Sequence, residues 1–306
     1  TNHKIYHLIM IMNKSLTYSV ILFLSGVFLL NIMGLLIKHL ELTYSPYQIS
    51  VYRNIFGIIP IIIILFFSSE WKKNNYQIMI PKLWVAYFRG ACITFAQICF
   101  FTSLIYLEFA TATALSFATP IVVTILSIPI LKQSIGVWRW FAVFIGFIGV
   151  FLIIDPSDDF FSYYSLLPLG AALGYGMSMV LVKVFPNKTP SALIQGQSQI
   201  SSLFFSLILL YLSSQYVEIE NTNDLILLIL MGSLGGLGVF LIIAAYRKTK
   251  PINVAPFEYF GILFAFALGW IVFGEAPFEK LFPGVIGIIA AGLIIFWRER
   301  KRESTQ

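Results

Sequence analysis

The sequence predicts an all-α polytopic membrane protein with ten transmembrane helices, and three observations lead to this fold class. Of the 306 residues, 58% are hydrophobic and only 11% are charged, whereas soluble domains contain about 25% charged residues. The apolar residues fall in windows of about 20, a length that crosses the ~30 Å hydrocarbon core of a bilayer. The basic residues are scattered through the short loops between these windows. This distribution is typical of membrane proteins, so the net charge of +6 does not indicate a nucleic-acid partner.

Ten apolar windows are expected to form the helices, and turn-forming or charged residues separate them. The windows cover residues 15–37, 46–67, 83–106, 109–131, 136–154, 161–184, 190–213, 223–246, 252–274 and 281–297. Pro46 begins the second window, Pro190 begins the seventh, and Pro251 precedes the ninth. Proline suits the first turn of a helix, because the N–H group that it lacks would have no helical partner there. The least distinct break is Lys132-Gln133-Ser134, between the fourth and fifth windows.

The loop charges predict a multi-pass protein of the inner (plasma) membrane with both termini in the cytoplasm. If the N-terminus is placed inside, the outer segments contain only two basic residues, Lys38 and Lys280, and most of the acidic ones. Cytoplasmic loops of membrane proteins carry an excess of Lys and Arg. Ten helices also require both termini on the same side of the membrane, so the two arguments agree.

A weak internal repeat divides the chain into two halves, about residues 15–155 and 158–298, within a single transmembrane domain of residues 1–306. When the chain is shifted by about 144 residues, Ser45-Pro46 aligns with Thr189-Pro190, and Arg53 aligns with Gln197. Each half contains five helices, an odd number, so the second half is expected to lie inverted relative to the first. Inverted repeats build many transporters, with the substrate site near the midplane between the halves. The alternative is a chance alignment of apolar sequence.

Several motifs resemble the EamA-type drug/metabolite transporters. They are ATATALSFATPIVVTILSIPIL and GVWRWFAVFIGFIGVFLIIDP in the first half, and NVAPFEYFGILFAFALGWIVFGE in the second. The resemblance covers about Ser15 to Trp297 and is closest to the branch of S-adenosylmethionine uptake carriers and their relatives. It implies ten helices in an inverted five-plus-five repeat, around a central cavity that opens alternately to the two faces. The family often has Gly-Glu at the end of the fourth helix, where this chain has Leu131-Lys132, so Glu275 is the one matching position.

The candidate substrate site is predicted from polar and aromatic residues inside the apolar windows. Glu258 comes first, because an ionisable side chain within a spanning helix costs about 3 kcal/mol or more and is a functional-site candidate by default. Arg89 lies at a matching depth, so a structural Arg89–Glu258 ion pair is the alternative to a proton- or substrate-binding role for Glu258. Arg53 is a candidate for an anionic group of the substrate, and its alternative is snorkelling to the membrane surface. The remaining candidates are aromatic and polar residues, and the alternative role for each of them is helix packing alone. They are Phe257, Tyr259, Tyr175, Ser116, Gln97, Asn31 and Gln197.

The expected function is secondary transport of a small polar metabolite, amino-acid-like or S-adenosylmethionine-like, by alternating access. The sequence contains no P-loop, so the energy is expected to come from a coupling ion such as the proton or from an exchanged metabolite. The expected partners are therefore the small-molecule substrate, the lipid bilayer and that coupling ion or metabolite. Enzyme signatures such as H-E-x-x-H and G-x-S-x-G are missing, and no catalytic residue, metal site or cofactor is predicted. The alternative is a non-transporting membrane scaffold or interaction protein.

Overall fold

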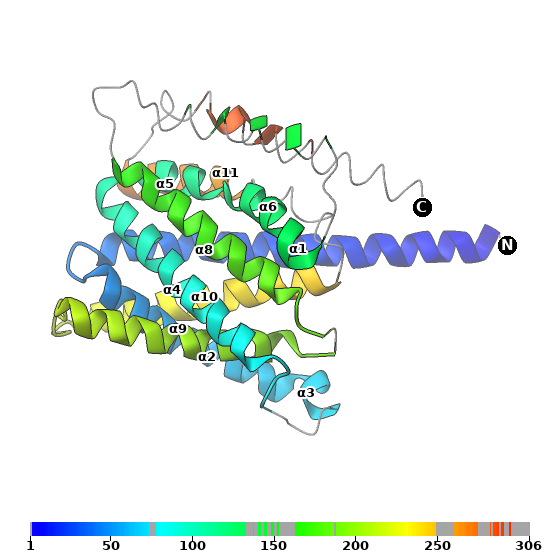
Figure 1. Ribbon diagram of the computed structural model, residues 1–306, viewed down its shortest axis with the longest axis horizontal. Helices are drawn as coiled ribbons and strands as arrows, with labels where there is room; N and C mark the ends of the chain where they lie inside the picture. The colour runs from blue at the N-terminus through cyan, green and yellow to red at the C-terminus, as the bar shows by residue number, and fades with distance from the viewer. Residues whose placement is uncertain are drawn as a thin grey trace.

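The computed structural model describes residues 2–73, 78–132, 163–186, 188–248 and 260–274, with isolated helical positions between 137 and 152 and between 282 and 294. Throughout these residues the regular elements are helices (Figure 1). Their bounds are α1 (Asn2–Leu40), α2 (Pro46–Phe67), α3 (Ser69–Lys73), α4 (Leu83–Tyr106), α5 (Phe109–Ser116), α6 (Thr119–Leu131), the 3₁₀ turn η1 (Tyr163–Ser165), α8 (Leu166–Val182), α9 (Ser191–Ser213), α10 (Thr222–Lys248) and α11 (Phe260–Phe273).

The membrane-spanning prediction is confirmed for most of the chain. Seven stretches of helix are long and apolar enough to cross a bilayer, and α11 is a shorter apolar helix within the expected ninth window. The isolated helical positions fall in the expected fifth and tenth windows, so helical residues occur in all ten. The first stretch begins at Thr17, and the part of α1 before it extends beyond the bundle (Figure 1).

The fourth apolar window forms two helical pieces instead of one. The first piece, α5, ends at Ser116, and α6 begins at Thr119 with Pro120 in its first turn. Proline has no N–H to continue the helical ladder from the preceding turn. Hydroxyl groups take over some of the carbonyls near the break: Ser116 Oγ donates to the Thr113 carbonyl oxygen at 2.8 Å, and Thr119 Oγ1 donates to the Ser116 carbonyl oxygen at 2.7 Å. The helix is therefore interrupted just before Pro120.

Small residues bring three pairs of helices into close contact. A β-carbon on Gly26 of α1 would lie 2.8 Å from the carbonyl oxygen of Gly238 of α10. A β-carbon on Gly236 of α10 would collide with the backbone of Gly57 of α2, and one on Gly90 of α4 would lie 2.5 Å from Ser201 Oγ of α9. These contacts place α10 against both α1 and α2, and α4 against α9, as parts of one tightly packed bundle.

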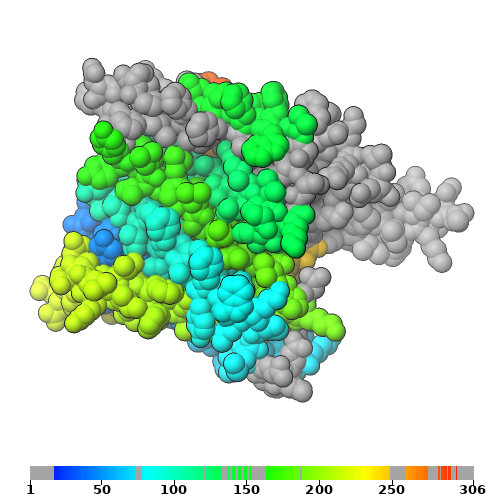
Figure 2. Space-filling view, viewed as in Figure 1, coloured from blue at the N-terminus to red at the C-terminus, as the bar shows by residue number. Residues whose placement is uncertain are grey.

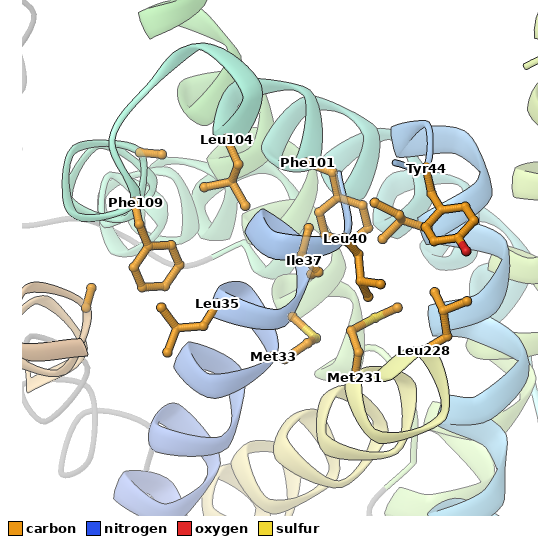
Figure 3. Packing of buried hydrophobic residues seen from close by; sticks show 13 residues of the cluster. Met33, Leu35, Ile37, Leu40, Tyr44, Phe101, Leu104, Phe109, Leu228 and Met231 are labelled. Carbon is orange, nitrogen blue, oxygen red and sulfur yellow. The ribbon is translucent and has the colours of Figure 1, made fainter. Parts of the chain in front are cut away.

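A hydrophobic cluster closes the end of the bundle that contains the α1–α2 turn, at the left of Figure 1. The cluster gathers buried side chains from the end of α1, the end of α4, the start of α5 and the first half of α10 (Figure 3). Its members include Met33, Leu35, Ile37, Leu40, Tyr44, Phe101, Leu104, Phe109, Leu228 and Met231. Because these residues come from the α1–α2 turn and from helices of both halves of the chain, they form an apolar plug at that end.

The outer surface of the bundle suits a lipid environment. The face drawn in Figure 2 is formed by α4, α6, α8 and α9. Large apolar side chains lie exposed on these helices, among them Trp84 and Phe95 on α4 and Phe204 and Leu207 on α9. In water such a surface would be unfavourable, whereas hydrocarbon chains of a bilayer can cover it. The helices therefore bury polar side chains against each other and turn apolar ones outward.

Candidate substrate site between two buried arginines

One face of α9 carries a polar stripe that points into the bundle. Gln195, Ser198, Gln199, Ser202 and Ser206 follow the spacing of one helix face, and all of them are buried. Buried polar groups are expected to be hydrogen-bonded, since leaving one unpaired costs about 1–3 kcal/mol. The partners of this stripe come from α2 and α4, which pack against α9.

Arg53 of α2 reaches this stripe from one side. Its side chain is 3% exposed, and Nη1 donates to Asn54 Oδ1 at 3.2 Å and to Gln199 Oε1 at 3.3 Å. Its Nε has no hydrogen-bond partner within the part of the chain that the structure describes. A β-carbon on Gly235 would lie 3.2 Å from this Nε, so the glycine leaves room for the guanidinium beside α10. Arg53 is thus enclosed by protein and does not snorkel to the membrane surface.

Arg89 of α4 reaches the same stripe from the other side. It is fully buried, with Nε donating to the Ser178 carbonyl oxygen at 2.9 Å and Nη1 donating to Gln195 Oε1 at 3.1 Å. Its Nη2 has no hydrogen-bond partner among the described residues. The two arginines therefore each keep one free donor while all of their bonded acceptors are neutral.

Hydrogen bonds between amides connect the two arginines. Gln195 Nε2 donates to Gln199 Oε1 at 3.0 Å, and this oxygen also accepts the bond from Arg53. On the far side of Arg53, Asn54 Nδ2 donates to Gln97 Oε1 at 3.1 Å, and Ser50 Oγ donates to the same oxygen at 2.7 Å. We call Ser50, Arg53, Asn54, Arg89, Gln97, Gln195 and Gln199 the arginine network.

The arginine network carries two positive charges and no described negative one. No Asp or Glu is among the buried polar residues of the described part of the chain. A guanidinium keeps its proton in proteins, so both charges are present. Burying a charge without a counter-ion costs several kcal/mol. An anionic group placed at this network would therefore be bound by charge as well as by the two free donors.

The structure brings some of the predicted site residues together and separates others. Gln97 joins Arg53 and Arg89 in the arginine network. Tyr175 of α8 is half-buried. Gln197 lies at the edge of the bundle, where Nε2 donates to the Ile78 carbonyl oxygen at 3.2 Å. Ser116 bonds within its own helix.

Asn31 of α1 is buried apart from the network, with Nδ2 donating to the Val27 carbonyl oxygen at 2.9 Å. Phe257, Glu258 and Tyr259 lie outside the described residues, as does Glu275. The Arg89–Glu258 ion pair therefore stays a prediction. Within the described residues no group of three or more His, Cys, Asp or Glu side chains could hold a metal ion.

Sequence reasoning missed Asn54, Gln195 and Gln199, which make most of the bonds of the arginine network. The missed signal was the polar stripe within SALIQGQSQISSLFFS, because its spacing marks one face of an otherwise apolar helix. Gln197 was chosen from the 144-residue shift alone. The helical periodicity shows that Gln195 and Gln199 share a face and that Gln197 points elsewhere.

The profile of the EamA-like transporter family matches residues 17–155 and, a second time, residues 162–297. The chain belongs to this family. This EamA protein is therefore a transporter and not an enzyme, with its helices in a membrane. The two matched segments together cover nearly all of the chain.

Curated relatives of this EamA protein carry transporter names. An S-adenosylmethionine uptake transporter of Rickettsia felis is 27% identical over 289 residues, which cover 91% of this chain and 94% of the relative. A riboflavin transporter of Vibrio cholerae is 30% identical over 190 residues, covering 61% and 63% of the two chains. An uncharacterized transporter of Helicobacter pylori is 26% identical over 294 residues, covering 93% and 96%.

A solved crystal structure has the same fold as this EamA protein. The two superpose with a TM-score of 0.67 at 13% sequence identity, over 94% of this chain and 99% of the other. At this identity the likeness concerns the arrangement of the helices alone.

Proposed function

We propose that this protein is a secondary transporter of a small metabolite that carries an anionic group such as a carboxylate, and that the arginine network binds this group. The observation that supports it is the pair of free donors, Arg53 Nε and Arg89 Nη2, on two buried cations. Bonds from a charged donor to a charged acceptor are about twice as strong as neutral ones. A bound carboxylate would also offset the cost of burying two positive charges.

The substrate class that fits is an amino-acid-like or S-adenosylmethionine-like molecule. The relatives named for S-adenosylmethionine uptake match this chain over nearly its full length, and those named for riboflavin match over about 60% of it. A molecule with a carboxylate at one end and a flat ring at the other would use the arginine network and an aromatic side chain such as Tyr175. Glu258, Phe257 and Tyr259 remain proposed members of the site on the basis of the sequence.

An inverted five-plus-five repeat is part of this proposal, and helix packing supports it. Shifting by 144 residues relates Gly57 to Ser201 and Gly26 to Gly170. Gly57 contacts α10, and Ser201 contacts α4 at Gly90, which the shift relates to the middle of α10. Gly26 likewise contacts α10, while Gly170 contacts α4 at Cys99. The same helix pairs therefore recur in the two halves, as a repeat requires.

Alternating access would follow from rocking of the two halves about the arginine network. The apolar plug closes the bundle at the α1–α2 end, so the conformation described is shut on that side. Loop charges favour the outside for this end and the cytoplasm for both termini, in a bacterial-type inner membrane. A proton gradient or an exchanged metabolite would supply the energy.

The decisive experiment measures uptake of labelled compounds into liposomes that contain the purified protein. The panel contains S-adenosylmethionine, methionine, lysine, riboflavin and a sugar phosphate, each with and without a proton gradient. We expect uptake of S-adenosylmethionine or an amino acid, and a loss of about 10-fold or more when Arg53→Met removes a charged donor. Gln197→Ala serves as the control, because Gln197 lies outside the network.

Two results would count against the proposal. Uptake of no compound on the panel would contradict the transport function in this form. Stronger competition by the sugar phosphate than by S-adenosylmethionine would retain transport and reject the substrate class.

A further inference from the structure

Two buried oxygen atoms on facing helices lack hydrogen-bond partners among the described residues. They are Oδ1 of Asn31 on α1 and Oγ1 of Thr113 on α5. Asn31 is 6% exposed and Thr113 is 8% exposed, so neither atom is solvated from the surface. A helical threonine often bonds back to the carbonyl one turn earlier, yet Thr113 does not, which leaves its hydroxyl free to donate or accept.

The contacts around these residues place them at one level of the bundle. On one side of them, a β-carbon on Gly34 of α1 would lie 3.0 Å from Cζ of Phe109, at the start of α5. On the other side, Gly261 of α11 lies against Val27 of α1 and against Phe117. Asn31 falls between Val27 and Gly34 in α1, and Thr113 falls between Phe109 and Phe117.

The third helix at this level is α11, and within its described residues, 260–273, it offers neither atom a polar partner. Gly261 and Gly269 of α11 contact the two aromatic residues that flank Thr113, and the residue midway between them is the buried, apolar Ala265. The two oxygens therefore face an apolar wall from α11. Each unpaired buried polar atom costs about 1–3 kcal/mol in a packed interior, a cost that a ligand can remove.

We propose that Asn31 and Thr113 form a subsite that binds the amino group of the transported molecule. An amide oxygen is an acceptor only, so its ligand must present an N–H or O–H donor, and the threonine hydroxyl can accept a second one. An ammonium group, with three donors, satisfies both atoms. The inference rests on the proposed transport function and deepens it. In addition to the hydrogen-bond donors of the arginine network, which we call the donor end of the site, it assigns Asn31 and Thr113 as hydrogen-bond acceptors, the acceptor end.

The depths of the two subsites suit one small zwitterionic group. Asn31 lies about 14 Å along α1 from the α1–α2 turn, and Arg53 lies about 10 Å along α2 from the same turn, at 1.5 Å per residue. The acceptor and donor ends therefore lie at similar depth, on two helices that both pack against α10.

The test compares Thr113→Val, which replaces the hydroxyl by a methyl group of similar size, with Thr113→Ser, which keeps it. Binding is measured with labelled S-adenosylmethionine and with its analogue that lacks the α-amino group. We expect Thr113→Val to weaken binding of S-adenosylmethionine by about 5- to 10-fold, the worth of one hydrogen bond. Thr113→Ser should bind S-adenosylmethionine about as tightly as the wild-type protein does. Thr113→Val should bind the analogue about as tightly as the wild-type protein does.

Thermal unfolding of the protein without ligand separates this role from a structural one. Thr113→Val should leave the melting temperature unchanged or raise it, because the hydroxyl has no partner among the described residues to lose. The matched control is Thr94→Val, since Thr94 Oγ1 bonds to the Gly90 and Ser202 carbonyl oxygens at 3.1 and 3.0 Å. This control should lower the melting temperature.

Three outcomes would overturn the subsite. A lower melting temperature for unliganded Thr113→Val would show that the hydroxyl is bonded in the resting protein. If Thr113→Val weakened binding of S-adenosylmethionine and of its analogue equally, Thr113 would not bind the amino group. Tight binding of the analogue to the wild-type protein would reject the subsite alone, whereas binding of neither compound would reject the proposed substrate class with it.

Discussion

The Tyr44 hydroxyl donates a 2.9 Å hydrogen bond to Oδ2 of Asp224 and so joins the α1–α2 turn to the first turn of α10. Next to it, Gln48 exchanges two bonds with the backbone of Val217: Nε2 donates to the carbonyl oxygen at 2.7 Å, and the Val217 N–H donates to Oε1 at 2.9 Å. These bonds cross between the two halves of the chain at the end that the apolar plug closes. They therefore hold the two halves together at this end, and under the proposed alternating access they would stabilise the conformation that is shut on this side.

Tyr44→Phe should destabilise the protein without disturbing the apolar plug. The ring stays in the cluster, and only the bond to a charged acceptor is lost, which is worth about 1.5–3 kcal/mol at most. A double-mutant cycle with Asp224→Asn, measured by thermal unfolding in detergent, isolates the interaction. A coupling free energy indistinguishable from zero would show that the bond does not contribute to stability.

The same bond predicts a loss of stability at alkaline pH. Burial, and then the hydrogen bond to Asp224, raise the pKa of Tyr44 to about 12 from an ordinary value of 10.0. A raised pKa in the folded state stabilises the protein below pH 10, and this contribution is lost as the pH rises from 10 to 12. The wild-type protein should therefore lose more stability over this interval than Tyr44→Phe does. If the stabilities of the wild-type protein and Tyr44→Phe fell in parallel over this interval, the raised pKa of Tyr44 would be contradicted.

Gly236→Ala should be among the most damaging small substitutions in the chain. The new β-carbon would collide with the backbone of Gly57, and a backbone atom cannot move aside as a flexible side chain can. Overpacking of this kind typically costs about 1–3 kcal/mol. Gly196→Ala is the control, because its β-carbon would meet only Ile61 Cγ2 at 3.4 Å, an ordinary contact. Equal melting temperatures for the two variants would argue against close packing of α2 and α10.

Gln195→Leu should uncouple the two arginines. Arg89 Nη1 loses its acceptor, and Gln199 Oε1 loses one of its donors. An unpaired charged donor in the interior costs about 1–3 kcal/mol or more, so we expect a clear fall in melting temperature and in uptake. Gln197→Leu, two residues away at the edge of the bundle, should have a small effect. A larger fall in melting temperature and uptake for Gln197→Leu than for Gln195→Leu would mean that Gln195 does not link the two arginines.

The sequence was sufficient to predict the helices, because a spanning helix must be long, apolar and continuous. The windows at 46–67 and 83–106 coincide with α2 and α4. That Arg53 and Arg89 lie within spanning helices followed from the same windows, whereas snorkelling of Arg53 stayed open until its burial was known.

The partners of the polar side chains were not predictable in the same way. Which residue faces Arg53 depends on the rotation of α9 about its axis, and close contacts such as Gly57 with Gly236 determine how the helices rotate and approach. The 144-residue shift selected Gln197 in place of Gln199, because a shift relates positions in the chain and contains no information about helix faces. Phe257, Glu258 and Tyr259 lie outside the described residues, so their proposed roles still rest on the sequence.

The orientation of the chain can be tested by thiol labelling of intact cells. The background is a protein in which the two cysteines, Cys92 and Cys99, are replaced by alanine. Asn221→Cys lies exposed at the α1–α2 end, and Lys73→Cys lies exposed at the opposite end. Because Lys and Arg collect at the end that contains Lys73, that end is expected in the cytoplasm. An impermeant thiol reagent should therefore label Asn221→Cys in intact cells and Lys73→Cys only after the membrane is opened. Labelling of Lys73→Cys from outside would invert the topology, and the plug around Met231 would then close the cytoplasmic side instead.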